Sequence, residues 1–176
     1  MICVESESES AAQAVLNDAV RKMERGNNSY RVLLGDADGE DAELFNLALS
    51  DCQAFALAHR ASSVAELVNY LAGTGKFVRG SDFCAPDVVL LDLNFSGPSS
   101  GFEVLKWIQS QATRLFRVVV LSAGGGEKER ERAYALGADG FVTKPRSVGE
   151  MIGVLTRIEG WLRNSAIEEA DEFCAA

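Results

Sequence analysis

The stretch "VVLLDLN", residues 88–94, runs four large apolar residues directly into an aspartate, Asp92. A short run of valine and leucine without polar alternation predicts a strand that is buried on both faces, as in a parallel sheet. Charged side chains are almost never fully buried without a partner. We therefore expect Asp92 either at the open end of a buried strand or beside a counter-ion.

Short apolar strands alternate with helical patterns on both sides of this stretch. This alternation predicts an α/β fold, a doubly wound five-stranded parallel sheet of flavodoxin-like order 2-1-3-4-5 in a three-layer sandwich. Two of the helices open on a Ser-x-x-Glu capping box, at Ser63 and Ser147. The predicted strands are 30–34, 54–58, 87–93, 117–122 and 140–144, and the predicted helices are 40–50, 62–73, 102–111, 127–137 and 147–162.

The pattern divides the chain into one domain and two ends. Residues 1–29 are predicted to be an acidic tail followed by a short helix, 30–162 the α/β domain, and 163–176 an acidic C-terminal tail. That last segment is too short for an output domain. We therefore expect the protein to act through protein contacts.

Composition excludes several classes of function. The 176 residues carry a formal net charge of -9, which repels phosphates, so no nucleic-acid partner is expected. The opening apolar run is too short for a signal peptide and no segment is long enough to span a membrane, so a cytoplasmic protein without membrane contact is expected. The four cysteines are scattered and there is one histidine, which favours reduced thiols over a zinc site.

Four polar residues follow four of the predicted strands: Asp36, Asp92, Ser122 and Lys144. In an open α/β sheet the ligand site lies outside the carboxyl ends of the strands, at the point where the strand order reverses. The order 2-1-3-4-5 makes these strands neighbours about 4.8 Å apart. Each residue alone has a structural explanation such as helix capping, but capping does not require a lysine. We therefore predict one cleft that combines two acids, a hydroxyl and an amine.

These residues, with "RVLLGDADGEDAEL", "PDVVLLDLN", "VVVLSA" and "ALGADGFVTKP", resemble the receiver domain of two-component response regulators, the CheY-like fold, over about 30–162. A long connection between the second helix and the third strand, together with "RIEGWL", more narrowly resembles the single-domain regulators that partner bacterial phytochromes and related histidine kinases.

The resemblance implies a role for each residue of the cleft. Asp92 would accept a phosphoryl group from a phosphohistidine. Asp36, Asp92 and the main-chain carbonyl of Asn94 would bind Mg²⁺, which neutralises charge during transfer. Lys144 would pair with a phosphoryl oxygen, aimed inward by a bond to Pro145 that is usually cis in this family.

Three further positions match the family's switch. Ser122 would donate a hydrogen bond to the phosphoryl group, and the small Ala123 would keep the approach open. Phe141 matches the aromatic residue that turns inward when the hydroxyl moves, a local charge event that biases a two-state element.

The chain departs from the family pattern in three places. Ala37 stands where a second acid usually contacts the metal, so Mg²⁺ binding should be weaker unless Asp38 moves in. The loop after Asn94 is one residue longer than usual, with Ser96 where a proline is common. Three glycines follow Ala123, which predicts a mobile switch region.

The expected function is that of a single-domain response regulator, which is not an enzyme. Its partners would be a histidine kinase, for which the narrower resemblance implies the phytochrome type, or a phosphotransfer protein, and a downstream protein target. The last helix carries two apolar stripes, one expected to face the sheet and the second to form a homodimer surface, with coverage by the N-terminal helix as the alternative. The first stripe is Val148, Ile152, Leu155 and Leu162, and the second is Met151, Val154, Ile158 and Trp161.

Two alternatives stay open. Ala37 favours a degenerate receiver that binds a partner without being phosphorylated. The string "LLGDADG" also resembles the start of haloacid-dehalogenase-type phosphatases, with Asp36 as nucleophile and Asp38 as general acid/base. The phosphatase hypothesis leaves Asp92 without a role and lacks the acidic pair that such enzymes need after the lysine.

Overall fold

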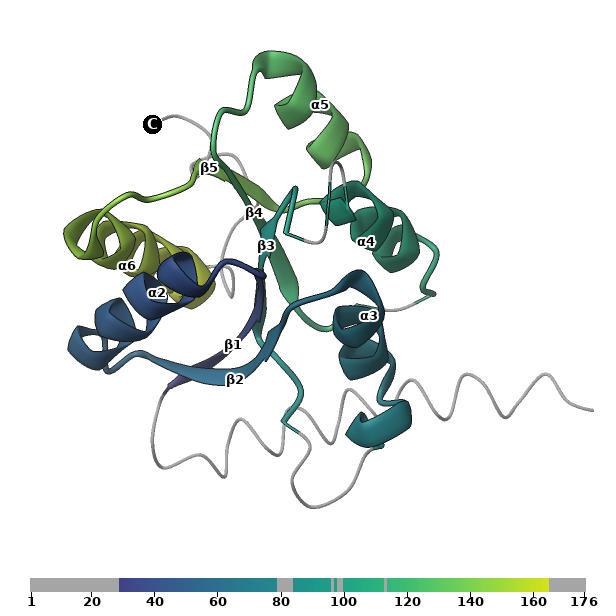
Figure 1. Ribbon diagram of the computed structural model, residues 1–176, viewed down its shortest axis with the longest axis horizontal. Helices are drawn as coiled ribbons and strands as arrows, with labels where there is room; N and C mark the ends of the chain where they lie inside the picture. The colour runs from purple at the N-terminus through teal and green to yellow at the C-terminus, as the bar shows by residue number, and fades with distance from the viewer. Residues whose placement is uncertain (1–28, 79–83, 96, 98–99, 113, 165–176) are drawn as a thin grey trace, which may run out of the picture.

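A computed structural model describes residues 29–78, 84–95, 97, 100–112 and 114–164 of the chain. Five parallel strands form one sheet in the order β2-β1-β3-β4-β5 (Figure 1), which confirms the predicted fold class and strand order. The strands are β1 (Tyr30–Gly35), β2 (Phe55–Ala61), β3 (Val88–Asp92), β4 (Arg117–Ser122) and β5 (Gly140–Thr143).

Helices cover both faces of the sheet, which gives three layers (Figure 1). On one face lie α2 (Gly39–Asp51) and α6 (Val148–Asn164). The other face carries α3 (Val64–Ala72), α4 (Ser100–Gln109) and α5 (Glu127–Ala135), and a short 3₁₀ turn, η1 (Gly75–Phe77), follows α3.

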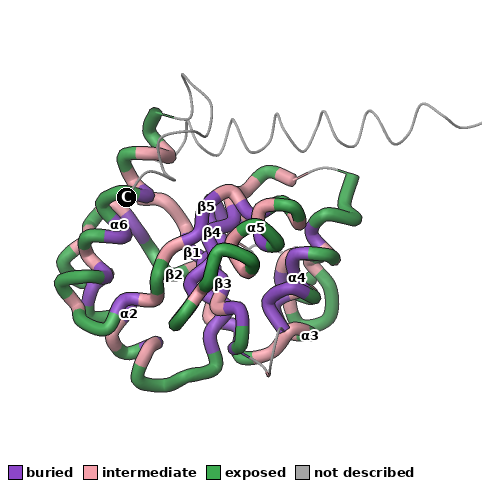
Figure 2. Tube along the Cα trace, turned by 90° about the horizontal axis from the view of Figure 1, so that it is seen from above, coloured by how far each residue is buried: buried purple, intermediate pink, exposed green. Residues whose placement is uncertain are grey.

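Strand β3 lies at the centre of the sheet and explains the apolar run of residues 88–91. Val88 and Leu90 belong to the core under α2 and α6, whereas Val89 and Leu91 belong to the core under α3, α4 and α5. All four side chains are fully buried. Figure 2 shows the buried residues concentrated in the strands and on the helix sides that face them. Burial on both faces requires an apolar residue at every position, so the usual alternation disappears.

The two predicted capping boxes are present, each displaced by one residue on the glutamate side. Ser63 accepts a hydrogen bond from the Glu66 N–H, while the Glu66 carboxylate accepts from the N–H of Ser62, not of Ser63. Ser147 and Glu150 repeat this arrangement at the start of α6. Each pair satisfies two N–H groups that have no partner within the helix.

Strand β2 is longer than predicted and includes His59, which the sequence pattern placed after the strand. The His59 ring stacks on Tyr70 at 5.1 Å between centroids and lies 3.1 Å from the Glu66 carboxylate. Both contacts are made by residues of α3. They stabilise His59 within β2, although the sequence around His59 does not predict that the strand extends this far. His59 thereby lies on the α3 side, apart from the predicted cleft.

The predicted division of the last helix into two stripes was wrong. The fully buried residues of α6 are Met151, Val154, Leu155 and Ile158, whereas Val148, Ile152, Trp161 and Leu162 are half-buried. Three residues of the supposed dimer stripe therefore pack inside the monomer, because α6 contacts both the sheet and α2 and its apolar arc is centred between the two stripes. The homodimer hypothesis loses the exposed surface that motivated it.

The predicted N-terminal tail and helix, and the C-terminal tail from 165 onward, lie outside the described residues. The domain boundaries at 29/30 and 162/163 stay predictions, although α6 itself continues to Asn164. Within the described part of the chain, no helix combines the length and the apolar character needed to cross a membrane.

Candidate functional site

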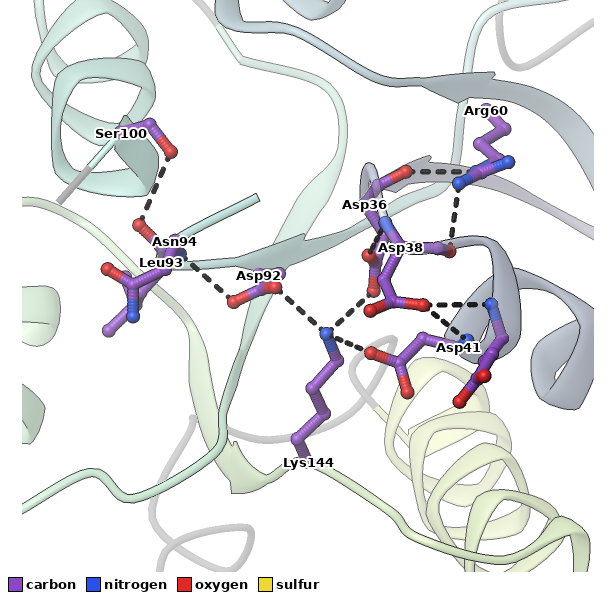
Figure 3. A network of polar contacts seen from close by, with 10 residues as sticks. Asp36, Asp38, Asp41, Arg60, Asp92, Leu93, Asn94, Ser100 and Lys144 are labelled. Carbon is purple, nitrogen blue, oxygen red and sulfur yellow. Dashed lines mark hydrogen bonds and ion pairs between the residues drawn. The ribbon is translucent and has the colours of Figure 1, made fainter. Parts of the chain in front are cut away.

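The cleft lies at the carboxyl ends of the central strands, where three of the four predicted residues meet around one ammonium (Figure 3). Lys144 directly follows β5, and its Nζ lies 2.8 Å from Asp92 Oδ2 at the end of β3. The same Nζ lies 3.0 Å from Asp36 Oδ2, directly after β1. The counter-ion expected for Asp92 is therefore Lys144, and Asp92 also lies at the open end of its strand.

A third carboxylate, which the sequence analysis missed, completes the cluster. Asp41 lies in the first turn of α2, and its Oδ2 is 2.6 Å from Lys144 Nζ (Figure 3). A signal was available, since the helix that follows β1 begins at the same edge of the sheet and Asp41 lies three residues after its N-cap. We name Asp36, Asp41, Asp92 and Lys144 the acidic cluster.

Burial shapes the protonation of this cluster. Asp36 is 2% exposed, and loss of hydration raises its pKa above the ordinary value, against the opposing effect of hydrogen bonds from Lys144 and the Asp38 N–H. Burial alone would lower the pKa of Lys144, but its bonds to Asp41, Asp92 and Asp36 outweigh that effect and raise it. Lys144 is therefore protonated, and its ammonium is shared among three carboxyl groups.

Asp38 does not take the place that Ala37 leaves. Its carboxylate caps α2 by accepting hydrogen bonds from the N–H groups of Glu40 (2.8 Å) and Asp41 (3.4 Å). The Asp38 N–H in turn donates to Asp36 Oδ1 at 2.9 Å. Asp38 thus orders the loop and fixes the start of the helix that carries Asp41.

Arg60 clamps the same loop from the end of β2. Its guanidinium donates to the carbonyl oxygens of Asp36 (2.9 Å) and Asp38 (2.8 Å) (Figure 3). A planar, permanently charged donor that bridges two carbonyls holds the loop against the sheet. The position of the Asp36 carboxyl group is therefore fixed from both sides.

Asp92 is held by the loop that follows it. Its Oδ1 accepts a hydrogen bond from the Asn94 N–H at 3.0 Å, which leaves Oδ2 for Lys144. The Gly101 N–H donates to the Leu93 carbonyl at 2.8 Å, and a Cβ atom on Gly101 would lie 2.6 Å from Leu93 Cα. Only glycine permits this close approach of α4 to the end of β3. Ser96 lies outside the described residues.

The Ser122 hydroxyl has a hydrogen-bond partner outside the acidic cluster. Ser122 ends β4 and is buried, and its Oγ donates to Glu129 Oε2 at 3.2 Å in the first turn of α5. Glu129 is a second residue that the sequence analysis missed, since it stands in the highly charged run "EKERER" of the predicted helix 127–137, where no single acid is distinguished from its neighbours. Of the four predicted cleft residues, Ser122 is the one whose side chain is held elsewhere.

Phe141 lies in β5 with its ring buried against the turn before α5. A Cβ atom on Gly125 would overlap the Phe141 ring, and the Arg130 guanidinium lies 5.6 Å from the ring centroid. The ring therefore occupies an inward position while the Ser122 hydroxyl is bonded to Glu129.

The expected cis bond before Pro145 is absent, because none of the described peptide bonds is cis. The expectation was wrong for this structure, yet Lys144 still points inward. The Lys144 N–H donates to the Ser122 carbonyl at 2.8 Å and so extends the pairing of β4 and β5 through the lysine. That register and the three carboxylates aim the ammonium without a cis bond.

A cleft of about 330 Å³ opens beside the ammonium and gives access to it from solvent. Ala123 is exposed on its wall, in keeping with the expected role of a small residue there. The residues that line this cleft are Glu40, Asp41, Leu44, Ala123, Lys144, Pro145 and Arg146.

The donor chemistry of the acidic cluster fits Mg²⁺, which prefers carboxylate and carbonyl oxygens. The carboxylates are spread around Lys144 Nζ, and among the described residues no three His, Cys, Asp or Glu side chains are arranged to hold a metal ion. The cluster therefore offers the oxygen ligands that Mg²⁺ prefers, but in this structure those oxygens are arranged around the ammonium of Lys144.

Comparison with known proteins assigns the chain to a family. The response regulator receiver domain profile matches residues 43–156. The phosphate regulon regulator PhoB of Klebsiella pneumoniae is 36% identical over 89 residues, covering 50% of this chain and 38% of PhoB. The sensory transduction protein RegX3 of Mycobacterium tuberculosis is 30% identical over 124 residues, covering 70% of this chain and 50% of RegX3. The chain thus spans half or less of the length of these relatives.

Two of the similar solved structures are named as phytochrome-type response regulators. The phosphorylated cyanobacterial phytochrome response regulator RcpA is 26% identical, with a TM-score of 0.66, over 78% of this chain and 96% of RcpA. The bacteriophytochrome response regulator AtBRR is 32% identical, with a TM-score of 0.57, over 73% of this chain and 91% of AtBRR.

The family profile begins inside α2, after the loop that carries Asp36 and Ala37, so the departure from the usual acidic pair lies ahead of the matched segment. The matched residues include Asp92, Ser122, Phe141 and Lys144. The match extends over more than half of the chain, and the strand order agrees with it. The chain therefore belongs to the response regulator receiver domain family.

Proposed function

We propose that the protein is a response regulator that accepts a phosphoryl group on Asp92 from the phosphohistidine of a histidine kinase. One observation carries this proposal: the Asp92 carboxylate lies at the end of the central strand, 2.8 Å from the ammonium of Lys144, a residue that lines an open cleft. Receiver domains are in general signalling domains, so one transfer and its reversal, without turnover of a metabolite, is the expected chemistry.

The transfer needs little from the protein beyond positioning and charge neutralisation. A carboxylate oxygen of Asp92 forms a bond to phosphorus as the phosphorus–nitrogen bond of the phosphohistidine breaks. The electron pair of that bond returns to the imidazole ring, which leaves neutral once protonation balances it. Lys144 offsets the charge added to Asp92, and Asp36 and Asp41 compete for the same ammonium until that moment.

Mg²⁺ would supply further charge neutralisation when bound. Asp36, Asp92 and the Asn94 carbonyl would hold it, and we propose that Ala37 weakens this binding because Asp38 is committed to capping α2. Replacing Ala37 with Asp should raise the affinity for Mn²⁺, measured by the electron paramagnetic resonance signal of the free ion. An unchanged affinity would contradict the assignment of position 37 to the metal site.

The kinase partner is proposed from similarity. RcpA and AtBRR are named as phytochrome and bacteriophytochrome response regulators, and both exceed 25% identity to this chain. We therefore propose a phytochrome-type histidine kinase as the phosphodonor, a downstream protein as the target, and a single-domain regulator as the form. Phosphotransfer from a purified kinase of this type, compared with an unrelated kinase, tests the partner.

A degenerate receiver is the second candidate, favoured by Ala37 and by the engagement of Ser122 with Glu129. Incubation with acetyl phosphate and Mg²⁺, followed by intact mass measurement, separates the two candidates. A live receiver gains about 80 Da, the mass of one phosphoryl group, and Asp92→Asn does not. No gain in the wild type, together with tight kinase binding, would establish the degenerate form instead.

The hydrogen bonds of Asp38 argue against a phosphatase of the haloacid-dehalogenase type. It needs Asp38 as a general acid/base, whereas the Asp38 carboxylate accepts two backbone hydrogen bonds at the start of α2. The proposed phosphotransfer uses Asp92 as the phosphoryl acceptor, whereas the phosphatase hypothesis leaves that residue without a role.

A further inference from the structure

The hydroxyl of Ser122 is held by a carboxylate from a neighbouring helix. Ser122 is 2% exposed, and its Oγ donates to Glu129 Oε2 at 3.2 Å. Glu129 is half-buried in the first turn of α5. A hydrogen bond to an ionised acceptor is roughly twice as strong as one between neutral groups, and bulk water hardly competes at a buried donor.

A serine hydroxyl has one proton to donate. Under the proposed function, on which this inference rests, the Ser122 hydroxyl would donate that proton to a phosphoryl group on Asp92. Glu129 and the phosphoryl group therefore compete for the same donor. We infer that Glu129 is a positioning residue that holds the Ser122 hydroxyl away from Asp92 and so sets how readily the phosphorylated state is reached.

The surroundings of the hydroxyl connect this competition to the switch aromatic. A Cβ atom on Gly125 would lie 3.0 Å from Ser122 Oγ and would overlap the Phe141 ring. Gly125 therefore packs closely against both the Ser122 hydroxyl and the Phe141 ring. A change of hydrogen-bond partner at Ser122 displaces its neighbours in this close-packed group, because packed interiors leave no slack.

The structure of the turn before α5 bears on how easily Glu129 can release the Ser122 hydroxyl. The N-cap of α5 is Gly126, which has no side chain to bond the first turn, so α5 begins without a side-chain cap.

Glu127 lies in the same turn as Glu129 and carries the same charge, but it is exposed. It offers a matched control, because its removal changes the net charge of α5 equally.

The test uses the full chain with beryllium fluoride and Mg²⁺ as the probe of the phosphorylated state, followed by fluorine NMR titration. Glu129→Ala should raise the affinity for beryllium fluoride about tenfold, the size expected for loss of a charge-assisted hydrogen bond in the resting state. Glu129→Gln, which keeps a neutral acceptor, should give a smaller gain. Glu127→Ala should stay within about twofold of the wild type, as expected for a screened surface charge.

The decisive comparison is a double-mutant cycle. In a Ser122→Ala background the Glu129→Ala substitution should give no gain, because there is no hydroxyl left to release. A gain that persists without the hydroxyl, or a Glu129→Ala affinity equal to that of Glu127→Ala, would overturn the inference.

A measurement without the probe separates this inference from the proposed function. In the ligand-free protein, Glu129→Ala and Ser122→Ala should shift the ring-proton resonances of Phe141, whereas Glu127→Ala should not. If the wild type binds no beryllium fluoride, the proposed function fails. The resonance shifts still show whether Glu129 holds the Ser122 hydroxyl beside Phe141. Absent shifts in both variants would refute the positioning role, and circular dichroism confirms that each variant is folded.

Discussion

Replacing Lys144 with Met removes the one cation of the acidic cluster. The methionine keeps most of the aliphatic length of the lysine, so the main loss is the ammonium bonded to Asp36, Asp41 and Asp92. Three carboxyl groups then share a small volume without a counter-ion. At neutral pH we expect a clear loss in the free energy of unfolding.

The magnitude follows from burial. The Lys144 side chain is 12% exposed and Asp36 is almost fully buried, so this pair is an interior one. Breaking a buried pair by removing one partner costs about 3–5 kcal/mol. Asp41 is 32% exposed and adds little, since exposed pairs contribute about 0–1 kcal/mol. Relaxation of Asp92 toward solvent offsets part of the loss, so we expect about 3 kcal/mol.

Urea unfolding followed by tryptophan fluorescence measures the effect. With a denaturant slope of about 2 kcal/mol per molar, the midpoint should fall by about 1.5 M at pH 7.5, with a chelator present so that no divalent ion replaces the ammonium. The matched control is Lys76→Met, because Lys76 is 68% exposed and pairs with Glu66 at 2.8 Å. That change should cost less than about 1 kcal/mol.

The pH dependence provides a second check. Burial already raises the pKa of Asp36, and removal of Lys144 raises it further, so the folded variant binds a proton more readily than its unfolded chain. Stability of the variant therefore rises as the pH falls, and its deficit should shrink as the pH approaches about 4. Equal midpoints at pH 7.5, or a deficit that is the same at pH 7.5 and pH 4.5, would refute this account of the cluster.

Three further substitutions test other parts of the site and its support. Asp36→Asn should raise the melting temperature by a few degrees at pH 7.5, because its raised pKa marks a carboxylate that is costly to ionise when folded; the gain should vanish as the pH falls below about 4. Gly101→Ala should lower stability in urea by about 2–3 kcal/mol, since its Cβ would lie 2.6 Å from Leu93 Cα; an unchanged midpoint would show that the backbone adjusts freely. Asp139→Ala removes an acceptor 2.7 Å from the Val118 N–H and should cost about 2–3 kcal/mol by the same measurement, whereas a loss below 1 kcal/mol would assign Asp139 a minor role.

The family resemblance and the pattern of strand ends predicted much of the site because its residues occupy fixed positions on regular elements. Asp92 and Lys144 follow β3 and β5, and parallel neighbouring strands must bring their carboxyl ends together. Asp41 escaped prediction because it meets Lys144 across two elements that are distant in sequence. Glu129 follows Ser122 closely along the chain, but the two belong to separate elements, and the sequence pattern does not show which side chain of the first turn of α5 meets the end of β4. In isolation each is an ordinary acid in the first turn of a helix, where acids are common for reasons of capping and dipole.

By itself the sequence determined the architecture, since continuous apolar strands separated by helical segments can be buried only in a sheet covered on both faces. It also determined which residues end the strands, because local hydrophobic pattern sets where each strand stops. Only the tertiary structure decided which partner each polar side chain takes, that Lys144 is shared by three carboxylates and that the Ser122 hydroxyl bonds to Glu129. Such contacts depend on distances of a few ångströms between separate elements, and helix and strand periodicity carry no information about them.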